Sequence, residues 1–269
     1  MRLLVNIGRR FGGIALVFFG VTFLIYASVF ALPGDPIAVL AGDRSLSEPV
    51  IAALRAKYHL DLPLWQQYLD YLGGLAHLDF GVNFNDQPVT ELMASRWPVT
   101  ITLAFTAWLF ELILGIGLGM LAALRQGTWI DRSVLFGTVV VSAIPVFVLG
   151  VTGQLIFGIK LHLVPIAGTT AGWPTAYLLP ALVIAVFGLA AVSRLTRESM
   201  IDSLGSDYVR AARARGLGQG RVIGVHVMRN SLIPTVTYLA TDLGYLLGGS
   251  VVVEGIFNCL LYTSDAADE

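Results

Sequence analysis

Cysteine and lysine are nearly absent from this sequence of 269 residues. The single cysteine, Cys259, excludes an intrachain disulfide framework and a CxxC motif. The only lysines are Lys57 and Lys160, and neither ends a GxxxxGKS or GxxxxGKT phosphate-binding loop. No catalytic constellation is visible, and the four histidines have no metal-ligand spacing: His59, His77, His162 and His226. We therefore predict no enzyme activity, no metal and no cofactor in this chain.

Charge is also scarce. Charged residues make up 13% of the chain and hydrophobic residues 56%, whereas soluble domains average about 25% charged. So few charges cannot cover a water-exposed surface, and the apolar excess is expected to face lipid. The net charge of −1 offers no basic surface for nucleic acid. These numbers predict an integral membrane protein.

Five stretches approach the roughly 20 apolar residues that a membrane-spanning helix needs, and they are residues 11–32, 100–124, 134–158, 176–193 and 232–253. The first could be read as a signal peptide, but its 22 residues exceed the usual h-region of about 7–15, so we predict an uncleaved anchor. Pro145 and Pro180 are expected to interrupt the third and fourth helices.

Arginine and lysine predict the orientation. With the N-terminus inside, residues 1–10, 125–133 and 194–231 hold 12 of the 17 basic residues, which favours a cytoplasmic N-terminus. The long outer segment, 33–99, has helical patterning around residues 48–59 and 65–75. We expect it to form a small folded cap.

The cytoplasmic loop 194–231 is the most informative part of the chain. Ser206 is a candidate N-cap, DYVRAARA (207–214) follows with strong helix formers, and Gly216 is a stop signal. A second helical piece is expected over 221–230. We call residues 206–230 the elbow. Its arginines could hold anionic lipid head groups, but the helix–glycine–helix order is better suited to docking another protein.

The elbow resembles the cytoplasmic signature of permease subunits of binding-protein-dependent ABC importers, which is Glu-Ala-Ala, three residues and Gly. Arg210-Ala211-Ala212 is followed by three residues and Gly216, with Arg in place of Glu. The family's later Leu-Pro is absent at its usual spacing, where Met228-Arg229 stand. DYVRAARARG and RNSLIP (229–234) are similar to the dipeptide/oligopeptide/nickel branch. So are further motifs: GDP (34–36), LDLPLWQQYLDYL (60–72), HLDFG (77–81), SAIPVFVLG (142–150), LLPAL (178–182) and GGSVVVEGIFN (248–258).

The resemblance implies an all-α polytopic protein of the bacterial or archaeal inner membrane with a type I ABC importer permease bundle. It implies an anchor (1–32), an outer segment (33–99) and a permease core (100–258), as in the first of two permeases. The partners would be a second permease, two ATPase subunits that bind ATP and Mg, and an external substrate-binding protein. Peptides are the implied cargo. The implied ATPase-coupling residues are Asp207, Tyr208, Arg210, Ala211, Ala212, Arg215 and Gly216.

Glu111 and Asp242 are expected inside the membrane, where each costs about 2.5–3.5 kcal/mol near a helix centre. They could contact a substrate amine or a metal cation on the translocation path, or hydrogen-bond a neighbouring helix. Pro145 could act as a hinge on that path or only shape the bundle. Glu254 could be a gate or an ordinary interfacial carboxylate. The pairs Gly115/Gly119 and Gly244/Gly248 are expected to permit close helix crossings.

A rival function is a proton-coupled secondary transporter that uses Glu111 and Asp242, but it leaves the elbow unexplained. The end of the chain, 259–269, departs from the family pattern, which continues with a Pro-Gly turn and a sixth span. Codons for CLLYTSDAADE can spell a transposase-adapter sequence. We therefore expect a foreign tail, with five spans present and the sixth lost by truncation.

Overall fold

The computed structural model describes residues 2–31, 48–57, 61–82, 87–249 and 251–259, and it divides into two units, Met1–Ser95 and Arg96–Glu269. Within these ranges every regular element is helical, apart from an isolated bridge between Val82 and Pro88. The GDP motif at 34–36 and residues 260–269 of the tail lie outside the described residues.

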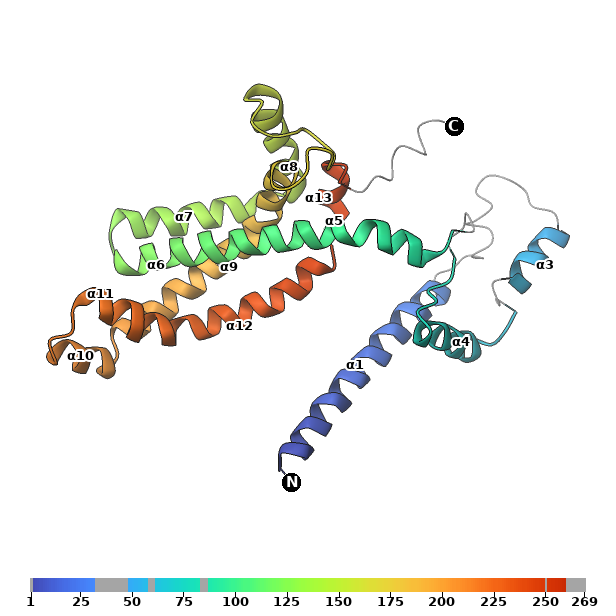
Figure 1. Cartoon of the computed structure of the whole chain (residues 1–269), viewed down its shortest axis with the longest axis horizontal. Coiled ribbons are helices and arrows are strands. Elements are labelled where there is room, and N and C mark those ends of the chain that lie inside the picture. Colours follow the sequence, from blue (N-terminus) through green and yellow to red (C-terminus); the bar gives the residue numbers. More distant parts are fainter. Residues whose placement is uncertain (1, 32–47, 58–60, 83–86, 250, 260–269) are drawn as a thin grey trace. The chain divides into compact units, whose positions relative to one another are not determined.

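The first unit is built on α1 (Arg2–Ala31), α3 (Glu48–Lys57) and α4 (Leu64–Ala76), labelled in Figure 1. The helices α3 and α4 lie where the patterning predicts them. Tyr68 of α4 joins α1 through its hydroxyl, which is 2.8 Å from the Thr22 hydroxyl and donates to the Phe19 carbonyl at 3.0 Å. Aromatic rings of Phe23 and Tyr26 pack edge-on or tilted against Tyr68. This contact fixes α4 to the second half of the anchor helix.

A continuous helix of 36 residues, Val89–Leu124, comprises α5 (Val89–Phe110), the π-helical turn η1 (Glu111–Gly115) and α6 (Ile116–Leu124), and it belongs to the second unit from Arg96 onward. Helix α9 (Thr175–Leu204) is central to this unit. It packs against η1, α6, α7 (Trp129–Ala143), α8 (Val146–Gly153), α12 (Met228–Leu247) and α13 (Val251–Ile256). The π-helical η2 (Gln154–Lys160) extends α8.

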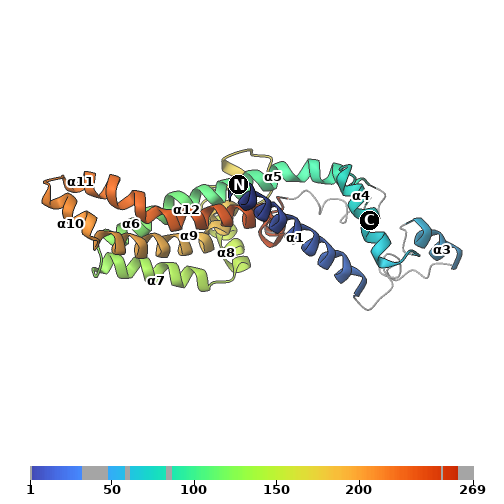
Figure 2. The same ribbon diagram turned by 90° about the horizontal axis from the view of Figure 1, so that it is seen from below.

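The elbow lies at one end of this unit and the α8–α13 region at the other (Figures 1 and 2). Its elements are α10 (Asp207–Ala214), α11 (Gln219–Arg221) and the π-helical η3 (Val222–Val227). The predicted second piece, 221–230, is continuous with α12 instead of ending before the next span. Helix α9 likewise runs to Leu204, beyond the predicted span end at 193. The non-helical part of the elbow is therefore short.

The prediction of five spans is not matched. Among the described residues, three helices are long and apolar enough to cross a membrane: Asn6–Ser28, Val89–Leu124 and Thr175–Leu204. A fourth is counted if Trp129–Ala143 and Val146–Lys160 form one broken span, bent by 98°. Helix α12 is excluded because Arg229, Asn230, Asp242 and several threonines make it too polar.

The two prolines behave differently. Pro145 caps the start of α8 at the 98° bend, so the predicted interruption of the third helix is confirmed. The prediction for Pro180 is wrong, because α9 continues through it unbroken. Pro180 lies near the start of α9, where loss of one backbone donor is tolerated more easily than in the middle.

Glycines set how closely α6 approaches α9. A Cβ at Gly115 would lie 2.7 Å from Cγ1 of Val192, and one at Gly119 would overlap the Ser193 carbonyl oxygen. The predicted close crossing at Gly115/Gly119 is confirmed. A Cβ built at Gly244 would have no atom of another residue within 4 Å, so the described residues form no close helix crossing at this position.

We expect Gly119→Ala to destabilise the protein, because the added methyl group meets backbone of α9 that cannot move aside. Overpacking of this kind costs about 1–3 kcal/mol, which a lower thermal unfolding midpoint in detergent would report. Gly117→Ala in the same helix is the control, since its Cβ meets nothing within 4 Å. Equal midpoints for the two variants would contradict the close crossing.

Candidate functional site

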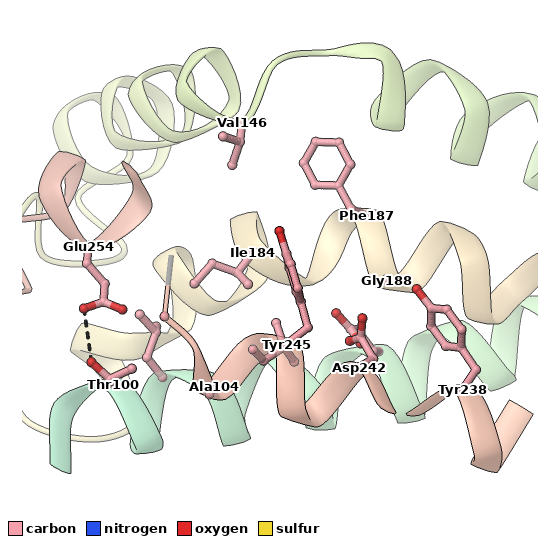
Figure 3. Close-up of a pocket in the computed structure, with 14 residues that line it drawn as sticks. Thr100, Ala104, Val146, Ile184, Phe187, Gly188, Tyr238, Asp242, Tyr245 and Glu254 are labelled. Atoms are coloured by element: carbon pink, nitrogen blue, oxygen red, sulfur yellow. Dashed lines mark hydrogen bonds between the residues drawn. The ribbon is translucent and has the colours of Figure 1, made fainter. Parts of the chain in front are cut away.

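A cavity of about 430 Å³ lies within the second unit between α5, η1, α9 and α12. Its ends are marked by Thr100 and Glu254 on one side and by Tyr238 and Asp242 on the other (Figure 3). The full lining is Thr100, Leu103, Ala104, Glu111, Val146, Ile184, Phe187, Gly188, Tyr238, Asp242, Tyr245, Leu246, Gly249 and Glu254. The wall is mostly apolar, with three carboxylates and two phenols.

The structure brings Glu111 and Asp242 together on this wall, although 131 positions separate them in the sequence. The two carboxyl groups interact directly. Glu111 is 1% exposed, and one oxygen of each residue, Oε2 of Glu111 and Oδ2 of Asp242, is buried without a hydrogen-bond partner. Pro145, predicted on the same path, does not line the cavity, but its neighbour Val146 does.

Gly188 of α9 provides the space for Glu111. A Cβ at this position would overlap both carboxylate oxygens of Glu111. The Glu111 side chain therefore lies flat against the α9 backbone, which a larger residue at 188 would prevent.

The other end of the cavity is closed by a side-chain hydrogen bond. The Thr100 hydroxyl donates to Oε2 of Glu254 at 3.1 Å, joining α5 to α13 (Figure 3). Glu254 is 3% exposed. This burial is more than an interfacial carboxylate would show, because such a group normally keeps its charge in water.

Sequence analysis missed three aromatic lining residues. Tyr238 and Tyr245 lie four positions before and three after Asp242, so they share its face of α12, and this helical spacing could have identified them. Phe187 is adjacent to Gly188 on α9. No sequence signal distinguishes these two residues from others in a long apolar run.

The predicted coupling residues, on α10 and in the turn that follows it, separate into a buried and an exposed group. Ala212 is buried, together with Val209, in a cluster with Met200, Val222 and Val227. The other six are exposed: Asp207, Tyr208, Arg210, Ala211, Arg215 and Gly216. Gly216 has φ +76°, a left-handed conformation that favours glycine. The elbow is thus a packed corner with an exposed outer face.

Polar contacts attach the elbow to the helices around it. Hydrogen bonding to Ser203, and more weakly to Ser206 and Asn230, lowers the pKa of Tyr208 below its ordinary value. Arg210 makes an exposed ion pair with Asp207 at 3.2 Å within α10. The tyrosine therefore links α10 to both α9 and α12.

A buried ion pair lies near the elbow and was not predicted. Arg197 of α9 donates from Nε and Nη2 to the two Asp131 oxygens at 2.5 and 2.8 Å. Asp131 also accepts the Gly127 backbone N–H at 2.9 Å and is 3% exposed. These contacts hold the α6–α7 turn against α9. The pair was not predicted from the sequence, where Arg197 counted only as a basic residue of the cytoplasmic loop and Asp131 carried no signal.

The described residues contain no group of three or more His, Cys, Asp or Glu side chains placed to hold a metal ion. Cys259 is free and buried beside Phe257, and its backbone N–H donates to the Glu254 carbonyl at 2.9 Å.

Comparison with known proteins gives consistent matches. Residues 115–262 match the family described as binding-protein-dependent transport system inner membrane component, and residues 1–104 match the N-terminal part of such a membrane component. The chain is 34% identical to the dipeptide transport system permease protein DppB of Escherichia coli K12, over 93% of this chain and 83% of the relative. It is 36% identical to the glutathione transport system permease protein GsiC of the same strain, over 93% and 81%.

A solved structure of the MetNI methionine ABC transporter in an inward-facing conformation is also similar. It aligns with a TM-score of 0.50 at 17% identity, covering 62% of this chain and 76% of that chain. At this identity the likeness shows the fold alone.

We expect Asp131→Ala to destabilise the second unit by about 2–4 kcal/mol, because it leaves the Arg197 guanidinium poorly paired in a largely buried site. The unfolding midpoint of the purified protein in detergent is the measurement. Asp207→Ala removes an acid from an exposed ion pair and is the matched control, with no measurable change in midpoint expected. A similar loss in both variants would contradict a structural role for the buried pair.

Proposed function

Since the chain belongs to the family of binding-protein-dependent transport system inner membrane components, we propose that it is the first of two permeases in an ABC importer for peptides. The observation that carries this proposal is similarity over 93% of the chain to permeases named for dipeptide and glutathione transport, since glutathione is itself a small peptide. As a permease it has no ATPase site of its own. ATP is bound and hydrolysed by separate subunits, and a binding protein delivers the cargo.

We propose a complex of this chain with a second permease as a heterodimer in the lipid bilayer, two ATPases and one external binding protein. The anchor (1–32), the outer segment (33–99) and the core (100–258) are its working parts. The outer segment would lie on the side where the binding protein docks.

Helix α12 is proposed as a further span despite its polarity. Of its two buried polar residues, Thr235 hydrogen-bonds Thr196 of α9 at 3.1 Å, whereas the Ser231 hydroxyl has no hydrogen-bond partner among the described residues. The Trp108 indole of α5 donates to the Leu239 carbonyl at 2.9 Å. Polar groups satisfied against neighbouring helices are tolerated within a membrane. If Asn6–Ser28, Val89–Leu124, the bent α7–α8 pair and Thr175–Leu204 each cross once, the N-terminus and the elbow face the same side, which the distribution of arginine makes the cytoplasm. A crossing α12 then places Val251 on the opposite side.

The elbow is proposed as the ATPase-coupling element. Asp207, Tyr208, Arg210, Ala211, Arg215 and Gly216 would face the ATPase, while Ala212 is part of the packed corner. Closure of the ATPase pair would then push on α10, and its buried contacts with α9 would transmit the movement to the bundle.

The cavity is proposed as a segment of the translocation path, with Glu111 and Asp242 on its wall. The break at Pro145 would act as a hinge, because α7 and α8 are joined there without helical hydrogen bonds. A self-sufficient proton-coupled transporter would also use two carboxylates. Family membership favours the ATP-driven importer, and the elbow has a role only in that mechanism.

The proposed crossing of α12 predicts which sides of the membrane three positions face. In a chain whose Cys259 is replaced by alanine, we expect Ala211→Cys to react with an impermeant maleimide only from the cytoplasm. Thr170→Cys and Val251→Cys are expected to react only from outside. Labelling of residues 211 and 251 from the same side would show that α12 does not cross.

The proposed coupling predicts the effect of reversing charge on the elbow. We expect the double variant Arg210→Glu/Arg215→Glu to reduce ATP-driven dipeptide uptake by about tenfold or more, since misplaced charges at an interface cost several kcal/mol. Uptake is measured in proteoliposomes that contain the complete complex. Arg125→Glu, an exposed arginine outside the elbow, is the control for charge alone. Unchanged uptake in the double variant would refute the docking role.

A further inference from the structure

The carboxylates of Glu111 and Asp242 lack the partners that buried acids normally have. Oε2 of Glu111 and Oδ2 of Asp242 are buried, accept no hydrogen bond from the described residues, and belong to side chains that line the same cavity. Glu111 is 99% buried on this wall. An unpaired buried acceptor costs about 1–3 kcal/mol, and more when it is charged. Two such oxygens on the wall of one cavity indicate a missing donor.

A positively charged group would satisfy both open acceptors best. Two neighbouring carboxylates repel each other when both are ionised, and a single shared proton or a cation removes that cost. Arg194 of α9 acts electrostatically on the nearby Tyr238 phenol. Among the described residues no ion pair joins Arg194 to either carboxylate, so the pair keeps its need for a cation from outside the chain.

The surroundings favour a primary ammonium group over a metal ion. A calcium ion takes six to eight oxygen ligands and a magnesium ion six. Only two carboxylates meet at this point of the cavity wall. The third lining carboxylate, Glu254, accepts a hydrogen bond from Thr100 at the far end. A primary ammonium has three N–H donors on one compact centre, which suits two free acceptors. Phe187, Tyr238 and Tyr245 line the same space, and aromatic faces stabilise a nearby ammonium.

We propose that Glu111 and Asp242 together bind a primary ammonium group of the cargo. This inference rests on the proposed import function and assigns the recognised group as the free amine of a peptide. The cavity volume of about 430 Å³ falls in the range of roughly 300–1,000 Å³ that holds small ligands. The apolar wall between the carboxylates and the Thr100–Glu254 bond would take the remainder of the molecule.

The direct test uses the complete purified complex and a carbodiimide. Dicyclohexylcarbodiimide reacts with protonated carboxyl groups in apolar sites, and mass spectrometry locates the product. We expect labelling of Glu111 or Asp242 in the empty complex, and propylammonium should reduce it by about tenfold at saturating concentration. Tetramethylammonium, which has no N–H donor, should protect much less. Absence of protection by propylammonium would overturn the proposal.

Two further experiments distinguish an ammonium site from a metal site and provide a control. Ni²⁺ and Mg²⁺ are added in place of propylammonium, and stronger protection by either metal than by propylammonium would identify a metal site and overturn the ammonium assignment. Asp202→Asn, an exposed acid of α9 outside the cavity, is the variant control and should leave labelling and protection unchanged.

Transport by the same preparation distinguishes this inference from the import function. We expect Asp242→Asn to lower ATP-driven uptake of a free-amine dipeptide about tenfold, the effect expected for losing a charged hydrogen bond. The control Asp202→Asn should retain both uptake and the ATP hydrolysis that loaded binding protein stimulates. If the wild-type complex takes up peptide normally but propylammonium does not reduce carbodiimide labelling, the amine site is overturned and the import function stands. Ammonium protection in a complex with no ATP-driven uptake of any peptide would overturn the import function and leave the amine site standing.

Discussion

The close approach of α6 and η1 to α9 is the constraint on which the second unit depends. Gly115 and Gly119 bring the two helices together, and Gly188 lets the Glu111 carboxylate lie against the α9 backbone. In lipid, helices gain little from burying apolar surface against one another, so close packing and internal hydrogen bonds must supply the association. The Thr196–Thr235 bond, the Trp108–Leu239 bond and the Arg197–Asp131 ion pair all extend this arrangement to neighbouring helices.

This packing also determines where polar groups are tolerated. Asp131 is fully paired, and Thr100 satisfies one oxygen of Glu254, whereas Glu111 and Asp242 each retain a free acceptor. The proposed amine site accounts for these two open acceptors, because an unpaired buried acceptor is costly unless a ligand completes it. The pattern therefore separates structural acids from those that await a ligand.

Much of this could be read from the sequence, where local patterns suffice. The family, the all-helical permease fold, the helices α3 and α4 and the glycine crossing at 115/119 all follow from spacing or motifs. Five apolar stretches were predicted, but only three helices of the described residues, or four with the bent pair, are long and apolar enough to cross a membrane. Helix α12 fails on polarity alone, and hydropathy along the chain contains no information about the partners that its polar residues find on other helices. The continuation of α9 to Leu204 and the pairing of Asp131 with Arg197 depend likewise on tertiary contacts. The meeting of Glu111 with Asp242 needs the fold itself, since no local signal relates α5–η1 to α12.

The unbroken course of α9 has a mechanical consequence. Gly188, at the cavity, and Leu204, beside the elbow, are separated by 16 residues of continuous helix, or about 24 Å at 1.5 Å per residue. A helix of this length behaves as a stiff lever, so a tilt of about 10° at one end displaces the other by about 4 Å. Because the Glu111 side chain lies directly on Gly188, such a displacement changes the spacing of the two carboxylates without any local unfolding. In the proposed mechanism, force applied at the elbow would thereby become a change of shape around the cargo.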